Sequence, residues 1–271
     1  MVRCSICKLE IGSSRERRHC LVGTCRGVYY RVGMGHIPPG SYKESGGKKY
    51  AMKISLAQID SVWESKKDNF VKAEDFISRA SAASCEIIFF PEMFATGFSM
   101  NTSATGESIT GETVQFVSSM ARRYRIQICA GYIRKLFPGR DFRNCAIVVD
   151  AGGKLIAEYS KMHLFSLSDE NRIHSAGDVP LVFRLGTFKA SVFICYDLRF
   201  PEIFRKVASS VQAIFVIANW PSKRQDHWET LLKARAIENQ CYVAGVNRVG
   251  TDGNMVAYAG GSVLYGPSGN E

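Results

Sequence analysis

From Met52 onward, the spacing of hydrophobic positions changes from one segment to the next. The segment that begins at Met52 alternates apolar and polar residues, as a strand does, and residues 66–83 repeat apolar side chains every three or four positions, which predicts a helix. Residues 87–90 are all apolar and are followed by Pro91. A short apolar run of this kind is typical of a strand that is buried on both faces.

The same alternation of strand and helix continues along the rest of the chain. Further helices are predicted from near Thr110, over about 200–208 with Pro201 near the first turn, and over about 225–239. Strand-like apolar runs occupy residues 126–133, 144–149, 181–185, 190–194, 213–218 and 242–247. Residues 150–153, Asp-Ala-Gly-Gly, indicate a hairpin turn. This order predicts an α/β layered domain rather than a helical bundle or a β-sandwich.

Residues 1–51 show neither period and are rich in glycine, arginine and serine, which predicts a poorly structured extension ahead of a folded domain at residues 52–271. The extension contains ten Lys or Arg and three Asp or Glu, a net charge of +7. The domain contains 25 Lys or Arg and 22 Asp or Glu, a net charge of only +3. The domain therefore has no strong attraction to polyanions, and no nucleic-acid partner is expected for it.

Cysteines in the extension leave a small zinc site as an alternative interpretation. Cys4 and Cys7 have the spacing of a metal-binding pair, and His19, Cys20 and Cys25 follow them. The second cysteine pair is spaced more widely than a zinc knuckle prefers, and the extension lacks apolar residues to pack around a metal. An unstructured segment is therefore favoured over a zinc-dependent module that would bind nucleic acid or protein.

The composition is that of a soluble globular protein. Apolar residues make up 46% of the chain and charged residues 22%. No run approaches the roughly eighteen consecutive apolar residues of a membrane span, so no membrane association is expected. The domain has an odd number of cysteines, five, and no secretory signal precedes it, so reduced thiols in the cytoplasm are expected.

Three ionisable residues stand at or just after apolar runs. Glu92 follows four apolar residues and a proline, and partial burial would make its carboxylate a usable general base. Lys161 has apolar neighbours and would be a fixed cation that stabilises an oxyanion. Cys195 ends an apolar run ahead of a turn and a helix, which favours a reactive thiolate. Taken singly, these residues also have ordinary interpretations: a solvated carboxylate, a lysine whose ammonium group reaches water, and an inert core thiol.

The three residues lie in distinctive motifs: Phe-Pro-Glu-Met-Phe at 90–94, Lys-Met-His-Leu-Phe at 161–165 and Cys-Tyr-Asp-Leu-Arg-Phe-Pro-Glu at 195–202. A fourth block contains Ala-Asn-Trp-Pro at 218–221 and Ala-Arg-Ala-Ile-Glu-Asn-Gln at 234–240. Over residues 52–269 the chain resembles the nitrilase superfamily of carbon–nitrogen hydrolases, whose hallmark is a Glu, Lys, Cys triad in that order. The fourth block is similar to the omega-amidase branch, which hydrolyses monoamides of dicarboxylic acids such as 2-oxoglutaramate and 2-oxosuccinamate.

The resemblance implies a four-layer αββα sandwich and a cysteine-dependent amidase that requires no metal or other cofactor. Glu92 would be the general base, and Cys195 would attack the amide carbonyl of a small-molecule substrate, release ammonia and form a thioester. Lys161 and the backbone N–H of Tyr196 would hold the oxyanion. Glu170 matches by position a second glutamate that orients the lysine in family members.

The wall of the substrate pocket is expected to include Asn219 and Trp220, with packing as the alternative role for Trp220. Arg199 is a candidate partner for the distal carboxylate of the substrate, because a guanidinium group suits that task. The alternative is that Arg199 pairs with one of three acids, Asp197, Glu202 or Glu238.

Two features depart from the family pattern. Asn171 follows Glu170 where the family often has a histidine, so no role is assigned to a histidine there. The sequence ends in a turn-like segment at residues 266–271, whereas family members continue with further sheet and a tail at a subunit interface. The sandwich is therefore expected to lack its C-terminal edge and to be less stable than a longer version.

The resemblance leaves the assembly and the reaction partly open. A homodimer is expected. The rival functions are another reaction of the superfamily, as in a carbamoylase, an aliphatic amidase or a nitrilase, and a catalytically impaired fragment that acts only through binding.

Overall fold

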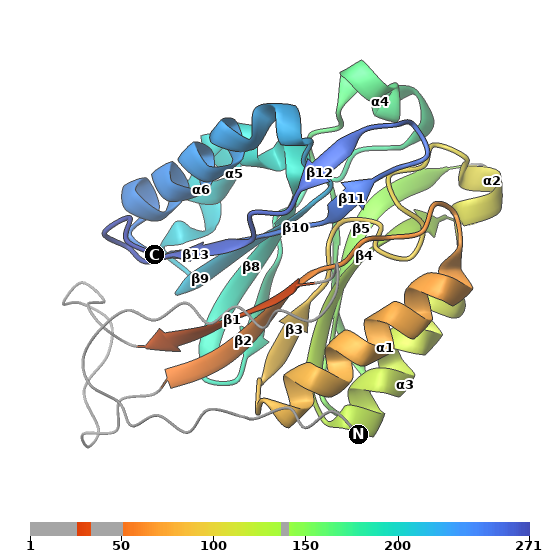
Figure 1. Ribbon diagram of the computed structural model, residues 1–271. Coiled ribbons are helices and arrows are strands. Elements are labelled where there is room, and N and C mark those ends of the chain that lie inside the picture. Colours follow the sequence, from red (N-terminus) through yellow and green to blue (C-terminus); the bar gives the residue numbers. More distant parts are fainter. Residues whose placement is uncertain (1–25, 34–50, 137–140) are drawn as a thin grey trace.

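Two β-sheets lie face to face in the computed structural model, which describes residues 26–33, 51–136 and 141–271. Figure 1 shows α1 (Lys66–Ala82) and α3 (Glu112–Tyr124) over the outer face of one sheet. On the opposite side of the molecule, α5 (Pro201–Ala208) and α6 (Gln225–Asn239) cover the outer face of the other sheet. The predicted α/β class and the four αββα layers are confirmed.

The first sheet has the strand order β1-β2-β3-β4-β5-β6. Its strands are β1 (Arg26–Gly33), β2 (Ala51–Gln58), β3 (Ile87–Phe89), β4 (Gln127–Lys135), β5 (Phe142–Val149) and β6 (Leu155–Ser160). The pairs β2–β3 and β3–β4 are parallel because a helix, α1 or α3, connects each pair. The pairs β4–β5 and β5–β6 are antiparallel, and the predicted hairpin turn at residues 150–153 joins the latter.

The second sheet has the strand order β13-β10-β9-β8-β7. Its strands are β7 (Val182–Leu185), β8 (Phe188–Ile194), β9 (Ala213–Ala218), β10 (Tyr242–Asn247) and β13 (Val263–Tyr265). The central strands β8, β9 and β10 are parallel, with α5 and α6 as the connections between them. A separate two-stranded ribbon is formed by β11 (Val249–Thr251) and β12 (Ala257–Ala259). Two short helices complete the fold, α2 (Thr102–Thr105) and α4 (Glu170–Ile173).

The main core lies between the two sheets. Phe89 on β3 and Phe215 on β9 are fully buried and stack across the interface with ring centroids 3.9 Å apart. A second core lies under α1, whose buried residues Phe76, Ile77 and Ala80 have the spacing that predicted this helix. Close packing between the sheets fixes the end of β3 relative to the ends of β8 and β9. These strand ends carry the candidate functional residues.

Within the segment 1–51, predicted to be poorly structured, residues 26–33 form the strand β1, which corrects the prediction for these residues; residues 1–25 and 34–50 lie outside the described part of the chain. Arg26–Gly33 pairs antiparallel with β2 along its full length, and Tyr30 stands opposite Ile54. The physical reason is local: residues 28–32 read Val-Tyr-Tyr-Arg-Val, and β-branched and aromatic side chains favour strands. A surrounding sequence rich in glycine and charge masked this short signal.

The candidate zinc ligands lie outside the described residues: Cys4, Cys7, His19, Cys20 and Cys25. Within the described residues, no group of three or more His, Cys, Asp or Glu side chains is arranged to hold a metal ion. In the same part of the chain, every helix is too short or too polar to span a bilayer.

Candidate active site

The structure brings Glu92, Lys161 and Cys195 together from three separate strand ends. Glu92 follows β3 after Pro91, Lys161 directly follows β6, and Cys195 directly follows β8. The Nζ atom of Lys161 lies 2.8 Å from Oε1 of Glu92, and the Cys195 thiol is close enough to both side chains for their charges to shift its pKa. Residues more than a hundred positions apart therefore share one site.

Glu170 joins the site as a second carboxylate on Lys161. Its Oε2 and Oε1 atoms lie 2.9 and 3.1 Å from Nζ of Lys161, and its Oε2 also accepts a hydrogen bond from the backbone N–H of Phe165 at 2.7 Å. Glu92, Lys161 and Glu170 are all fully buried. One buried ammonium group thus bridges two buried carboxylates.

Asn144 on β5 links the two carboxylates, a contact that the sequence analysis did not predict. Its side-chain N–H₂ group donates to Oε1 of Glu92 and to Oε1 of Glu170, at 2.7 Å each. The signal in the sequence is a polar residue at the start of the apolar run 144–149, where a buried side chain must find partners. Asn144 is fully buried.

The carboxylates and the ammonium group shift one another's pKa in a consistent way. Burial raises the pKa of Glu92, and the nearby charge of Lys161 only partly offsets this. Burial also acts to raise the pKa of Glu170, but Lys161, Asn144 and the N–H of Phe165 outweigh it, so this pKa lies below its usual value. Burial would lower the pKa of Lys161, yet the two carboxylates raise it above its usual range. Glu92 is therefore the carboxylate better suited to accept a proton.

The surroundings of Cys195 raise the pKa of its thiol and favour the neutral form, which corrects the expectation that they favour the thiolate. Burial raises its pKa well above the usual value, and the charges of Glu92 and Glu170 raise it further, whereas only Lys161 lowers it. The site has two carboxylates and one ammonium group, so a thiolate meets an excess of negative charge. The neutral thiol must therefore lose its proton during the reaction, and its neighbour Glu92 is the available base.

Asn219, at the end of β9, holds Glu92 from the other side. Its backbone N–H donates to Oε2 of Glu92 at 2.9 Å, and its side-chain amide donates to the backbone carbonyl of Glu92 at 2.8 Å. The backbone carbonyl of Asn219 accepts a weak hydrogen bond from Sγ of Cys195 at 3.8 Å. Asn219 therefore fixes the base and contacts the nucleophile.

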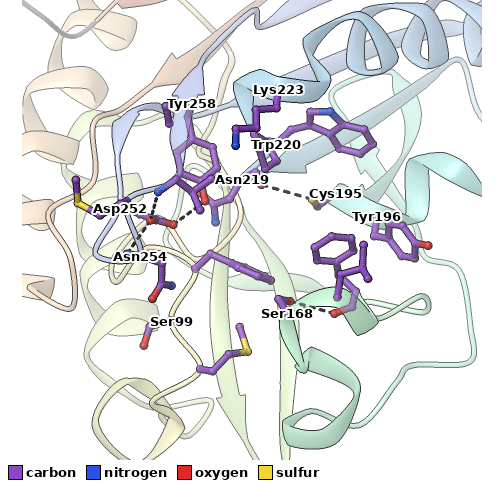
Figure 2. Close-up of a pocket in the computed structure, with 18 of the residues that line it drawn as sticks. Ser99, Ser168, Cys195, Tyr196, Asn219, Trp220, Lys223, Asp252, Asn254 and Tyr258 are labelled. Atoms are coloured by element: carbon purple, nitrogen blue, oxygen red, sulfur yellow. Dashed lines mark hydrogen bonds between the residues drawn. The ribbon is translucent and has the colours of Figure 1, made fainter.

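A cavity of about 930 Å³ opens beside Cys195. The residues that line it include Cys195, Tyr196 and Arg199, together with Asn219 and Trp220, the two residues expected in the wall of a substrate pocket. Figure 2 shows the first two at one end of the cavity and Asp252 and Asn254 toward the other. The buried residues Glu92, Lys161 and Glu170 do not line it, so Cys195 stands between the buried charges and the cavity.

Trp220 serves both as cavity wall and as packing. It lines the cavity, is 2% exposed, and contacts Trp228 with ring centroids 5.5 Å apart. Its Nε1–H donates to the backbone carbonyl of Arg224 at 2.8 Å. Trp220 therefore combines a place on the cavity wall with buried packing against Trp228.

Arg199 contacts none of the three acids named as alternative partners within the part of the chain that the structure describes. Its Nη2 lies 3.1 Å from Nδ1 of His227, and its guanidinium group lies 5.1 Å from the centroid of the Trp220 ring. The Asp197 carboxylate is occupied by Tyr159, Ile194 and His163, and Glu238 pairs with Arg235 and Arg205. The guanidinium group of Arg199 thus lies on the cavity wall, and none of the described residues gives it a carboxylate partner.

Gly131 on β4 allows the turn that carries Glu92 to pack against the sheet. A Cβ atom at this position would lie 2.6 Å from Cα of Glu92 and from the backbone nitrogen of Met93. Contacts that short do not occur, so a side chain would push the turn away. No local sequence pattern marks this glycine, because its role depends on close packing against the turn at Glu92, which is distant along the chain.

Replacing Gly131 with alanine is therefore expected to displace the candidate base. We expect kcat to fall by about 10²-fold, because small displacements of catalytic groups have effects of that size. We also expect the free energy of unfolding to fall by about 1–3 kcal/mol, because the added methyl group overpacks the contact. Gly152→Ala is the control: Gly152 is exposed, and an added Cβ would meet only the flexible side chain of Asp150. Wild-type kcat in Gly131→Ala would show that the turn adapts without consequence.

Comparison with known proteins gives the family. The sequence model of the Carbon-nitrogen hydrolase family matches residues 53–270. The chain is 36% identical to the 2-oxoglutaramate amidase of Bacillus subtilis, over 80% of this chain and 83% of that protein. It is 34% identical to the omega-amidase YafV of Escherichia coli, over 80% of this chain and 82% of that protein.

Solved structures agree with this relationship. The crystal structure of XC1258 from Xanthomonas campestris, a CN-hydrolase superfamily protein, superposes with a TM-score of 0.75 at 32% identity, over 80% of this chain and 83% of that chain. An amidase from a Nesterenkonia species superposes with a TM-score of 0.72 at 26% identity, over 81% and 84%. The chain therefore belongs to the carbon–nitrogen hydrolase family, the nitrilase superfamily, and is a hydrolase of carbon–nitrogen bonds of the omega-amidase-like branch.

Proposed function

We propose that this hydrolase is a cysteine-dependent amidase that converts the omega-amide of a small dicarboxylic acid monoamide, of the 2-oxoglutaramate and 2-oxosuccinamate class, to the acid and ammonia. One observation carries the proposal: a cavity-facing thiol lies beside a buried carboxylate whose pKa is raised by burial, and a buried ammonium group contacts that carboxylate. This arrangement supplies a nucleophile, a base and a fixed cation.

In the first half of the reaction, the Glu92 carboxylate takes the proton of the Cys195 thiol as sulfur attacks the amide carbonyl. Protonation removes the negative charge that Glu92 presents to Lys161, so the ammonium group is freed to stabilise the oxyanion that forms on the substrate. The backbone N–H of Tyr196 is the second donor in this proposal. Glu92 then gives its proton to the leaving nitrogen, the C–N bond breaks, and ammonia and a thioester remain.

In the second half, Glu92 takes a proton from water as the water oxygen attacks the thioester. The tetrahedral intermediate collapses with cleavage of the C–S bond, and the sulfur of Cys195 recovers the proton from Glu92. The sum is amide plus water to carboxylic acid plus ammonia. Glu170 and Asn144 stay in place and keep Lys161 and Glu92 oriented through their hydrogen bonds.

Ammonia release from a panel of substrates tests the function. The panel contains 2-oxoglutaramate, 2-oxosuccinamate, an N-carbamoyl amino acid, an uncharged aliphatic amide and a nitrile, with Cys195→Ala as the inactive control. We expect the two oxo-acid monoamides to have the highest kcat/KM. A preference for the carbamoyl compound, the aliphatic amide or the nitrile would assign another reaction of the superfamily, and no release from any of them would favour a protein that acts only by binding.

The substrate's distal carboxylate is assigned to Arg199. The assignment is supported by the position of Arg199 on the cavity wall and by the absence of an acidic partner for it among the described residues. Two related proteins carry the names 2-oxoglutaramate amidase and omega-amidase, which agrees with a substrate that has one amide and one carboxylate.

Arg199→Ala is expected to raise KM for 2-oxoglutaramate by about tenfold or more and to change KM for an uncharged amide of similar length by less than about twofold. The reason is that a charge-assisted hydrogen bond to carboxylate contributes roughly 1.5–3 kcal/mol, whereas a neutral substrate makes no such contact. Steady-state kinetics with both substrates measure the difference. Arg205→Ala, on the exposed face of α5, is the matched control. An equal rise in KM for both substrates would reject the assignment.

Three further features are part of the proposal. The hydrolase domain occupies residues 52–271, which the family match almost spans, and β1 adds a strand to the edge of its first sheet. A homodimer is supported by the exposure of the large apolar residue Ile237 on the outer helix α6, and light scattering tests it. A cytoplasmic location is supported by five free thiols among the described residues.

A further inference from the structure

Asp197 is a fully buried carboxylate two residues after Cys195, and the mechanism above gives it no task. Its Oδ2 accepts hydrogen bonds from the hydroxyl of Tyr159 at 2.8 Å and from the backbone N–H of Ile194 at 3.0 Å. Its Oδ1 accepts from the backbone N–H of His163 at 2.8 Å and contacts Nδ1 of the same imidazole at 3.0 Å. A buried charge with this many donors is a built feature of the fold.

The donors to Asp197 come from both sides of the candidate triad. Ile194 directly precedes Cys195, while Tyr159 and His163 stand two residues before and two residues after Lys161. Asp197 therefore ties the end of β8, which carries the nucleophile, to the end of β6, which carries the buried cation. A shift of one strand end relative to the other would stretch several of these hydrogen bonds at once.

The turn at Cys195 needs such a restraint. Cys195 has a φ angle of +46°, in the left-handed region that residues other than glycine seldom adopt. A backbone in this conformation persists only where surrounding contacts hold it. The bond from the N–H of Ile194 to Asp197 closes the turn from within, and the bonds from Tyr159 and His163 fix its place against Lys161.

We propose that Asp197 and His163 are positioning residues that set the place of the Cys195 thiol relative to Glu92 and Lys161. The inference rests on the proposed thiol chemistry and extends it to two side chains that need not touch the substrate. The His163 imidazole donates to Asp197 through Nδ1 and stacks on the Phe200 ring, with centroids 3.7 Å apart and planes within 8°. The side chain of His163 is 27% exposed, so it tolerates replacement better than the fully buried Asp197.

Two replacements of His163 separate positioning from stability. His163→Leu removes the Nδ1 donor, whereas His163→Asn places an amide N–H₂ group where Nδ1 was, and both variants lose the stack on Phe200. We expect similar melting temperatures for the two variants. We expect kcat to fall at least about tenfold in His163→Leu with KM within about twofold of wild type, and to recover to within about threefold in His163→Asn. Tyr159→Phe, which loses one donor, should lie between them.

Alkylation of Cys195 by iodoacetamide provides a readout that does not depend on the substrate. Because the nearby charge of Lys161 lowers the pKa of the Cys195 thiol, a thiol displaced from Lys161 forms the thiolate less readily, and we expect alkylation in His163→Leu to be at least about fivefold slower than in wild type and in His163→Asn. Mass spectrometry with Cys195→Ala as the control locates the label. Equal kcat and equal alkylation rates in the leucine and asparagine variants would overturn the proposal. If wild type hydrolyses no substrate, the alkylation comparison still decides the positioning role separately from the proposed function.

Discussion

Replacing Glu92 with glutamine is expected to reduce amide turnover by about 10³-fold or more while Cys195 remains reactive toward small alkylating agents at neutral pH. Turnover falls because general acid–base catalysis contributes roughly 10²–10⁴-fold, and Glu92 moves protons in both halves of the proposed reaction. Reactivity persists because the charge of Glu92 raises the pKa of the Cys195 thiol, and its removal lowers that pKa. Ammonia release and the pH dependence of iodoacetamide labelling measure the two effects.

Glu170→Gln is the matched control for this prediction. It also removes one buried negative charge beside Lys161, but the charge of Glu170 raises the pKa of the thiol less than the charge of Glu92 does. We expect its turnover to fall by at most about tenfold, because the amide still accepts a hydrogen bond from the ammonium group. Equal losses in the two variants would mean that Glu92 acts only through its charge on Lys161. Turnover within tenfold of wild type in Glu92→Gln would remove Glu92 from the role of base.

The long regular elements were predictable from the sequence because their apolar spacing is strong. The predicted bounds of β9 at 213–218, β10 at 242–247 and α6 at 225–239 agree with the structure. Each contains either an unbroken apolar run, which predicts a buried strand, or apolar residues three and four positions apart, which predict a helix. The short strands β11 and β12 escaped prediction because three residues are too few to establish a period.

The membership of the candidate site was predictable where a motif carries it, but its contacts were not. Glu92, Lys161 and Cys195 each lie in a short motif at or just after an apolar run, so local sequence locates them. Asn144 and Gly131 act through strands that meet only in the folded sheet, and no local pattern gives that register. The residues that support the triad are therefore placed by contacts between strands in the folded sheet.

The ionisation of Cys195 shows the same limit in electrostatic form. From the sequence, a helix start and one lysine favour a thiolate, but the sign of the shift depends on how many charges share the buried volume. The structure places two carboxylates beside one ammonium group, so the pKa of the thiol is raised and not lowered.

The partner of Arg199 was also not predictable from the sequence. Asp197, Glu202 and Glu238 were all possible partners. The structure gives Asp197 and Glu238 other partners and places the guanidinium group of Arg199 against His227 and Trp220.

Replacing Lys161 with methionine is expected to reduce turnover by at least about 10²-fold and to destabilise the fold in a pH-dependent manner. Loss of an oxyanion donor costs about 10²–10³-fold in kcat. The free energy of unfolding should fall by about 3–5 kcal/mol at neutral pH, because two fully buried carboxylates lose the cation they share. Urea unfolding at several pH values measures the effect.

The pH dependence follows from the direction of the carboxylate pKa shifts in this variant. Without Lys161, burial and mutual repulsion raise the pKa of Glu92 and Glu170 in the folded state above the usual value of 4.5. A raised folded-state pKa gives stability that is present below pH 4.5 and is lost as the pH rises through the folded value. The difference from wild type should therefore widen from pH 4 to pH 8.

A second replacement separates the buried charge from the lost side-chain volume. In Lys161→Met combined with Glu170→Gln, one of the two uncompensated carboxylates is gone, so part of the lost stability should return at pH 8 and little of it at pH 4. Lost packing alone would instead give the same deficit at every pH and no recovery in the double variant. That result would show that Glu92 and Glu170 do not share a charge-stabilising cation, and it would remove the electrostatic basis on which Lys161 holds the base and the oxyanion in one site.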